Sequence, residues 1–133
     1  MVAQSLPAKK WRSQEDFSLE SGETLPGLEI AYETWGRLSP EGDNVVVILH
    51  ALSGSSHAFS SAENPELGWW EGLWDEGAPL RSGKYHIICA NSIGGCYGTT
   101  GPSSINPDTG APYAADFPQV TLRDMIEAQR LFL

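Results

Sequence analysis

A polar loop that directly follows an apolar run holds the residues best suited to chemistry. Residues 45–49 are apolar and mostly β-branched, and His-Ala-Leu-Ser-Gly follows at 50–54. Such a run is typical of a strand buried on both faces of a sheet. Ligands gather at the carboxyl ends of strands in open α/β sheets, so the backbone N–H groups of Ala51, Leu52 and Ser53 are candidate oxyanion donors. An ordinary turn after a buried strand fits the same residues.

A second apolar run also ends in an unusual loop. Residues 85–90 indicate another buried strand, and the loop at 91–107 is rich in glycine. Glycine allows left-handed or closely approaching backbone, and this loop is expected to leave the same sheet edge as residues 51–54. The two loops could therefore wall one pocket. A phosphate cradle is disfavoured because Gly-Lys-Ser/Thr is missing, and a structural turn remains an alternative.

The histidines and cysteines indicate neither a general base nor a metal site. His50 is expected to orient the loop by hydrogen bonding, because a base needs a nucleophile within reach and none is identifiable. His57 is expected to be a solvated loop residue or to line a pocket mouth, and His86 lies within a strand. The spacing of Cys89 and Cys96 fits no redox pair, zinc cluster or disulfide framework. Free thiols and no bound metal are expected.

Composition excludes several classes of function. The 133 residues carry 17 acidic and 8 basic side chains, for a formal net charge of −9. Nucleic acid is therefore not an expected partner. No stretch has the length and apolarity of a membrane span or a leader peptide, so the sequence predicts a soluble, cytoplasmic protein with no membrane partner.

The supporting elements indicate an α/β fold. Residues 17–19 and 28–36 alternate apolar and polar positions and predict an antiparallel pair. A long crossover between the two buried strands predicts that they are parallel. Three tryptophans within residues 67–74 predict a short helix packed on the sheet. Thr121 and Asp124 resemble a capping box and predict that a helix begins there.

Several of these segments together resemble the N-terminal part of the homoserine O-acetyltransferase family. The resemblance runs from about Phe17 onward and is most specific in the long glycine-rich run. The segments are Ile-Ala-Tyr-Glu-Thr-Trp-Gly at 30–36, His-Ala-Leu-Ser-Gly-Ser-Ser-His at 50–57, Gly-Trp-Trp at 68–70, the run at 94–107, Asp-Phe-Pro at 116–118 and Thr-Leu-Arg-Asp-Met at 121–125.

The resemblance implies the N-terminal portion of an α/β-hydrolase fold, with a mostly parallel sheet and an antiparallel N-terminal hairpin. It implies transfer of acetyl from acetyl-CoA, a co-substrate, to the hydroxyl of L-homoserine in methionine biosynthesis, by ping-pong chemistry on a serine. No bound cofactor is expected, and the full-length form is expected to be a homodimer. The Leu52 N–H matches an oxyanion donor of the family. The residues expected to line the pocket are Ala51, Ser53, Gly54, Gly95 and Tyr97.

The sequence departs from the family in lacking the nucleophile. Members carry a G-x-S-x-G elbow, and the acid and the histidine of the triad follow it. Residues 54–58 and 101–105 are near misses without the second glycine. Residues 1–14 are expected to be a flexible terminus and residues 15–133 a partial domain that stops before the elbow. This chain alone is expected to be inactive. An O-succinyltransferase acting on homoserine or serine, an ester hydrolase of the same fold, or an inactive gene fragment remain alternatives.

Overall fold

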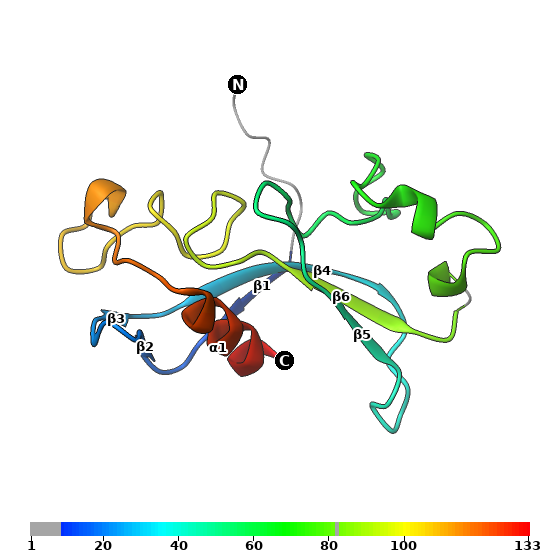
Figure 1. Ribbon diagram of the computed structural model, residues 1–133, viewed down its shortest axis with the longest axis horizontal. Helices are drawn as coiled ribbons and strands as arrows, with labels where there is room; N and C mark the ends of the chain where they lie inside the picture. The colour runs from blue at the N-terminus through cyan, green and yellow to red at the C-terminus, as the bar shows by residue number, and fades with distance from the viewer. Residues whose placement is uncertain (1–8, 82) are drawn as a thin grey trace. The chain divides into compact units, whose positions relative to one another are not determined.

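The computed structural model describes residues 9–81 and 83–133 and contains short strands joined by long loops (Figure 1). One α-helix, α1, lies near the carboxyl end of the described chain. The strands, 3-10 helices and α-helix, in chain order, are β1 (Lys9–Arg12), β2 (Phe17–Ser18), β3 (Thr24–Leu25), β4 (Glu29–Gly36), β5 (Val45–Ile48), η1 (Glu71–Leu73), η2 (Pro79–Arg81), β6 (His86–Ala90), η3 (Ala114–Asp116) and α1 (Leu122–Phe132).

The main sheet is mixed and has the strand order β1-β4-β6-β5. β5 pairs parallel with β6, which places Val47 opposite Ile88. β4 pairs antiparallel with β6, which places Trp35 opposite Ile87. The parallel pair predicted from the two apolar runs and the long crossover is therefore confirmed, and so is the α/β class.

The predicted pairing of residues 17–19 with residues 28–36 is wrong. β2 instead pairs antiparallel with β3, with Phe17 opposite Leu25. A tight turn closes this hairpin, since the amide of Gly22 donates to the carbonyl of Leu19 at 2.9 Å. Gly22 has a φ of 88°, which a glycine adopts at little cost. A local hairpin closes a short loop, so it forms at a smaller entropic cost than a more distant pairing.

Part of the segment that was expected to be a flexible terminus forms regular structure. Residues 9–12 form β1, at the edge of the main sheet. The amide of Ser13 donates to the carbonyl of Leu28 at 2.8 Å, and Lys10 forms an ion pair with Glu29 at 3.1 Å. These backbone and side-chain bonds hold residues 9–13 to the chain beside β4. The remainder of the predicted terminus, residues 1–8, lies outside the described residues.

The chain forms two compact units, and the first comprises Lys9 and residues 32–90. Phe59 lies at the centre of its core, 5.2 Å from the ring of Trp35 edge-to-face and 5.0 Å from the stacked ring of Trp74. Trp69 and Trp70 stack on each other and are each 44% exposed. Of the three tryptophans predicted to pack on the sheet, Trp74 therefore does so most clearly. The other buried core residues are Ile48, Ala58, Ile87 and Cys89.

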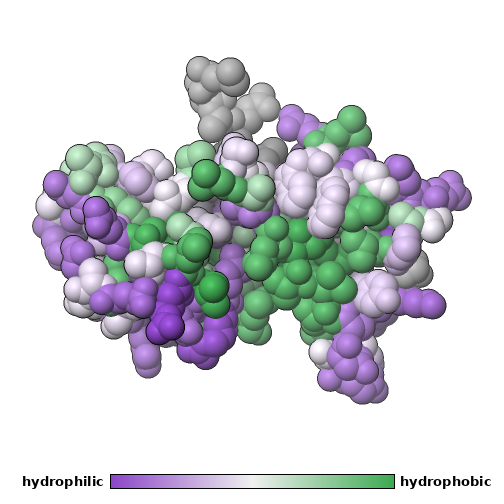
Figure 2. Space-filling view, in the orientation of Figure 1, coloured by the Kyte–Doolittle hydropathy of each residue, from purple (hydrophilic) through white to green (hydrophobic). Residues whose placement is uncertain are grey.

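The sequence predicted that β5 is buried on both faces, and this prediction is wrong. Val45 and Val47 are each 39% exposed and Leu49 is 69% exposed, whereas Ile48 is buried in the core. The reason is that β5 is an edge strand, and the segment at 58–80 covers only the face that carries Val46 and Ile48. Figure 2 shows apolar surface over this part of the sheet as a green patch.

The second unit comprises residues 10–31 and 91–133. Helix α1 begins at a complete capping box, in which Thr121 accepts from the amide of Asp124 and Asp124 accepts from the amide of Thr121. This confirms the predicted cap. The Asp124 carboxylate also accepts the amide of Glu20 at 2.9 Å, so one buried side chain caps the helix and holds the β2–β3 turn. Within the described chain, α1 and the 3-10 helices are all too short or too polar to cross a membrane.

We expect Asp124→Asn to lower the free energy of unfolding by about 1 kcal/mol near neutral pH, as loss of a cap does. Burial alone raises the pKa of Asp124, but hydrogen bonds from Thr121 and Glu20 hold that pKa below its ordinary value of 3.8. The stabilisation is therefore present above that pH and is lost as the pH falls through the lower folded-state pKa. Urea unfolding of the variant and of the parent chain at several pH values measures this difference in the free energy of unfolding.

Asp116→Asn is the matched control, because it removes an exposed carboxylate from the same unit. The control is expected to change stability by less than about 0.5 kcal/mol. A loss that is equal in both variants, or that does not shrink in acid, would contradict the role given to Asp124.

Candidate functional site

The loop after β5 presents free backbone donors. The amide of Gly54 donates to the carbonyl of Ala51 at 2.8 Å and closes a turn. Within residues 9–81 and 83–133, the amides of Leu52 and Ser53 meet no hydrogen-bond acceptor, and the Leu52 side chain is fully exposed. His50 Nδ1 lies 2.8 Å from the carbonyl oxygen of Ala51, which fits its predicted loop-orienting role. Two adjacent N–H groups at a strand end are thus available to an anionic oxygen.

The glycine-rich loop, in the second unit, is tightly tied to β4. The hydroxyl of Thr99 accepts the amide of Ala31 and donates to the carbonyl of Asn91, both at 2.9 Å. A Cβ on Gly101 would lie 2.3 Å from the carbonyl oxygen of Gly95, so glycine is required there. These bonds make the loop a rigid scaffold, which is part of what the structural-turn alternative predicted.

Both candidate pocket residues of this loop lie on its exposed side. Tyr97 is 40% exposed, and Gly95 is also exposed. The carbonyl of Tyr97 accepts the side-chain amide of Asn91 at 3.0 Å, which fixes the backbone beneath the ring. That these two residues share a pocket with residues 51–54 stays a prediction.

A buried charged pair lies just beyond the loop after β5, and the prediction of a solvated His57 is wrong. His57 is 5% exposed, and its Nδ1 lies 2.9 Å from Oε2 of Glu33. Its Nε2 lies 2.9 Å from the carbonyl oxygen of Glu66. Both ring nitrogens therefore face an oxygen acceptor, which favours the doubly protonated, charged imidazolium.

The environment raises the pKa of His57. Burial alone would lower that pKa, but the hydrogen bond with Glu33, the hydrogen bond with the carbonyl of Glu66 and the nearby negative charge outweigh burial. The side-chain nitrogen of Asn64 lies 3.1 Å from Nδ1. Two donors would meet there when His57 is charged, so the amide is expected to turn its oxygen toward the ring.

Ser56, Glu33 and His57 are of the types found in a nucleophilic triad, but their connections differ from one. The Ser56 hydroxyl donates to Oε1 of Glu33 at 3.0 Å rather than to the histidine. Ser56 is also only 1% exposed, so no substrate can reach it. A nucleophile needs a hydrogen bond to its base. The cluster is therefore a support and not a second catalytic centre.

A second carboxylate fixes the chain that follows the cluster. Glu71 accepts the amides of Ser60 and Gly68 at 2.8 and 2.9 Å. Burial alone raises the pKa of Glu71, but these hydrogen bonds and that from the Ser60 hydroxyl lower its pKa overall. A Cβ on Gly68 would lie 2.2 Å from the carbonyl oxygen of Ala58, so the two backbone segments touch.

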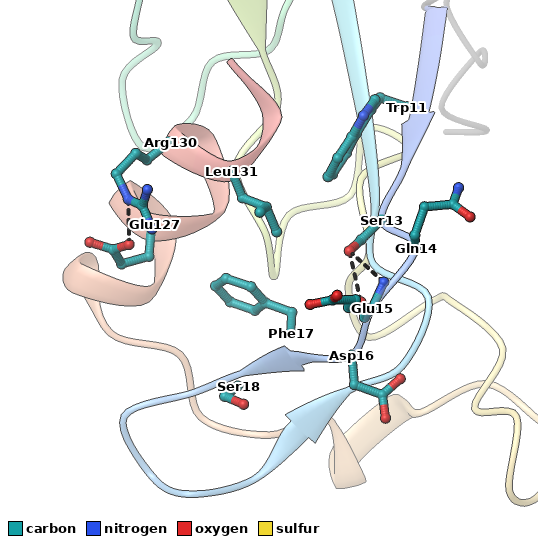
Figure 3. Close-up of a pocket in the computed structure, with 10 residues that line it drawn as sticks. All are labelled: Trp11, Ser13, Gln14, Glu15, Asp16, Phe17, Ser18, Glu127, Arg130 and Leu131. Atoms are coloured by element: carbon teal, nitrogen blue, oxygen red, sulfur yellow. Dashed lines mark hydrogen bonds and ion pairs between the residues drawn. The ribbon is translucent and has the colours of Figure 1, made fainter.

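An open cavity lies in each unit, and neither of the two is lined by residues 51–54. The cavity of the first unit has a volume of about 760 Å³ and lies between β4 and the loop at 60–64, with Glu33 and Trp74 in its lining. The cavity of the second unit has a volume of about 550 Å³ and is drawn in Figure 3. Its charged Arg130 is paired with Glu127 at 2.7 Å. Neither lining assembles a nucleophile with a base.

The two cysteines are both free thiols, one buried and one exposed. Cys89 is buried, and its burial together with the charge of Glu33 raises the pKa of its thiol to about 12. Cys96 is exposed on the glycine-rich loop. Among the residues that the structure describes, no three His, Cys, Asp or Glu side chains gather as metal ligands.

Known proteins resemble this chain in both sequence and fold. No family model matches it. A homoserine O-acetyltransferase from Moorella thermoacetica is 50% identical over 119 residues, which are 86% of this chain and 31% of that protein. A homoserine O-acetyltransferase structure from Bacillus anthracis is 34% identical, with a TM-score of 0.81 over 97% of this chain and 36% of that one. The chain is a relative of the homoserine O-acetyltransferases. It shares part of their α/β-hydrolase fold.

Another relative carries a name that indicates a different acyl group and a different acceptor. A serine O-succinyltransferase from Emericella nidulans is 47% identical over 121 residues, which are 91% of this chain and 23% of that protein. The chain thus spans about a third or less of the length of each of these three proteins.

Sequence reasoning missed Glu33 as a partner of His57, although a signal was present. Alternate residues of a strand share a face, so Glu33 lies on the same face of β4 as Ala31 and Trp35. A carboxylate flanked on its face by apolar residues must be paired when it is buried. The alternation of residues 28–36 by itself predicts only a strand of an antiparallel pair and does not identify this partner.

We expect Gly68→Ala to lower the free energy of unfolding by about 1 to 3 kcal/mol, because the new methyl group meets backbone that cannot move aside. Gly72→Ala is the control, since a Cβ at Gly72 has nothing within 4 Å. The free energy of unfolding of the Gly72→Ala variant should lie within about 0.5 kcal/mol of that of the parent chain. Chemical denaturation compares them, and equal effects would contradict the close contact between residues 58 and 68.

Proposed function

We propose that the protein to which this chain belongs is a cytoplasmic acyltransferase that moves acetyl from acetyl-CoA to the hydroxyl of L-homoserine, in methionine biosynthesis. The observation that carries the proposal is the pair of unpartnered amides at Leu52 and Ser53, at the end of a parallel strand. The names of the relatives support the same chemistry. Acetyl-CoA is a co-substrate, no cofactor is bound, and the full-length form is a homodimer.

The geometry suits the tetrahedral intermediate of acyl transfer. As the carbonyl is attacked, its oxygen gains negative charge, and a fixed N–H donor lowers the barrier by roughly 3 to 4 kcal/mol in comparable sites. The amide of Leu52 supplies this donor, and Ala51, Ser53 and Gly54 line the pocket beside it.

The chemistry proceeds in two half-reactions. A serine accepts the acetyl group and releases the CoA thiol, and the homoserine hydroxyl then attacks the acyl-serine with a histidine as base. The 133 residues contain no G-x-S-x-G sequence, so the serine, acid and base come from chain other than these residues. Residues 1–133 alone are accordingly expected to be inactive.

A second candidate is transfer of succinyl, or transfer to serine. It is favoured by the succinyltransferase names of two relatives, which are 47% and 46% identical to this chain. An esterase is also a structural neighbour, with a TM-score of 0.82 and 32% identity. Hydrolysis differs from transfer only in that water replaces the acceptor hydroxyl.

A thiol-release assay on the complete protein separates these candidates. Acetyl-CoA and succinyl-CoA are compared as donors, each with homoserine, serine or no acceptor. We expect release with acetyl-CoA that depends on homoserine and follows ping-pong kinetics. Release that prefers succinyl-CoA or serine would establish the second candidate, and release without an acceptor would indicate hydrolysis. Homoserine-dependent release by residues 1–133 alone would overturn the expected inactivity.

Leu52→Pro tests the oxyanion donor, because proline has no N–H. We expect kcat of the complete protein to fall by roughly 100- to 1,000-fold, as it does when one such donor is removed. Leu52→Ala is the matched control: it keeps the amide and removes only an exposed side chain, so kcat should change little. Equal losses in the two variants would show that the side chain, and not the N–H group, matters at this position.

A further inference from the structure

The loop that carries the free amides is held at both ends. It begins where β5 ends, and Ile48 is buried in the core there. Beyond the loop, the carbonyl of Ser55 accepts the indole N–H of Trp69 at 2.8 Å. Ser56 and His57 then bond to the two carboxylate oxygens of Glu33. The position of the loop is therefore set by β5 at one end and by β4, through Glu33, at the other.

A small displacement of Glu33 would be passed to the loop through Ser56 and His57, which bond to its carboxylate. It lies opposite Cys89 in the β4–β6 register, in the middle of the sheet, and is 7% exposed. The groups that face His57 are the carboxylate of Glu33 on β4, the carbonyl and carboxylate of Glu66 and the carboxylate of Glu71. All the ionised groups among them are acids, so a neutral His57 would leave Glu33 as an uncompensated charge in the protein interior.

We propose that Glu33 and His57 are positioning residues of the acyl-transfer site, and that their charged pair fixes the backbone of residues 51–54 so that the Leu52 and Ser53 amides keep their direction. Neither side chain touches the reacting atoms. A donor that moves by an ångström or turns away loses most of its effect on the oxyanion, as displaced catalytic groups do. The catalytic part of this inference rests on the proposed function, whereas the mechanical coupling of the pair to the loop does not.

Nuclear magnetic resonance of the complete wild-type protein tests the coupling without any substitution. The His57 ring should titrate above its ordinary midpoint of 6.5, because its folded-state pKa is raised. The charged pair is intact below 6.5 and is lost only as the pH rises through the raised folded-state pKa of His57. We expect the amide shifts of Leu52 and Ser53 to change with the same midpoint as the His57 ring. Loop amides that do not follow His57 would overturn the inference.

Glu33→Gln then removes the charge while keeping the size of the side chain. The pKa of His57 should fall, since its burial remains and the neighbouring charge is gone. At a pH where the wild-type titration shows His57 still charged, the Leu52 and Ser53 amides of this variant should therefore shift toward the high-pH state of the wild-type protein. Glu63→Gln is the matched control, because it removes an exposed carboxylate from the same segment and should leave both signals unchanged.

Kinetics of the complete protein separate the two parts of the inference. Glu33→Gln should lower kcat by roughly 10- to 100-fold, as misplacement of a catalytic group does. KM should change by less than about threefold, since the interaction lost belongs to the transition state. Coupled loop amides with an unchanged kcat would overturn the catalytic part of this inference, whereas the oxyanion role of the loop itself is decided by Leu52→Pro. If Glu33→Gln fails to fold, the wild-type titration still decides the coupling.

Discussion

The buried pair of Glu33 and His57 is the constraint on which the first unit depends. Removing two charges from water is costly, and in real proteins the penalty is several kcal/mol for each ion. The cost is offset here because every polar atom of the pair has a partner: Ser56 and His57 for the carboxylate, and Glu33 and the Glu66 carbonyl for the ring. Loss of one member would leave the other charged and unpaired, at a cost of about 3 to 5 kcal/mol. The hydrogen bonds of the pair therefore hold Ser56, His57 and the carbonyl of Glu66 in one arrangement about Glu33.

That single arrangement organises the segment that covers the sheet. Immediately after His57, Ala58 and Phe59 enter the core, and the ring of Phe59 lies between those of Trp35 and Trp74. The carbonyls of His57 and Ala58 accept the amides of Trp69 and Trp70, which holds the next stretch of chain alongside. The ring contacts are not directional enough to specify a register by themselves. The directional hydrogen bonds of the pair join His57 to Glu33 and to the carbonyl of Glu66, and the ring contacts add apolar burial.

Local chemistry explains which features could be predicted from sequence. The start of α1 depends on Thr121 and Asp124 only three residues apart, and the parallel β5–β6 pair depends on two continuous apolar runs. The features that were missed are long-range. Glu33 and His57 are 24 residues apart, and the exposure of Val45 depends on which strand lies at the sheet edge. Periodicity reports the polarity of each position but not the partner that a buried polar residue finds.

The proposed oxyanion role of the loop is consistent with relatives of different substrates sharing this part of the fold. An oxyanion donor bonds only to the carbonyl oxygen, and that oxygen is the same in an acetyl and in a succinyl group. The support beneath the loop is likewise independent of the acyl tail, since Glu33 and His57 are both buried. Relatives named for acetyl and for succinyl transfer can accordingly be 50% and 47% identical to this chain. Selection between donors requires contacts with the atoms that differ, such as the distal carboxylate of succinate, and a backbone N–H aimed at the common oxygen makes none.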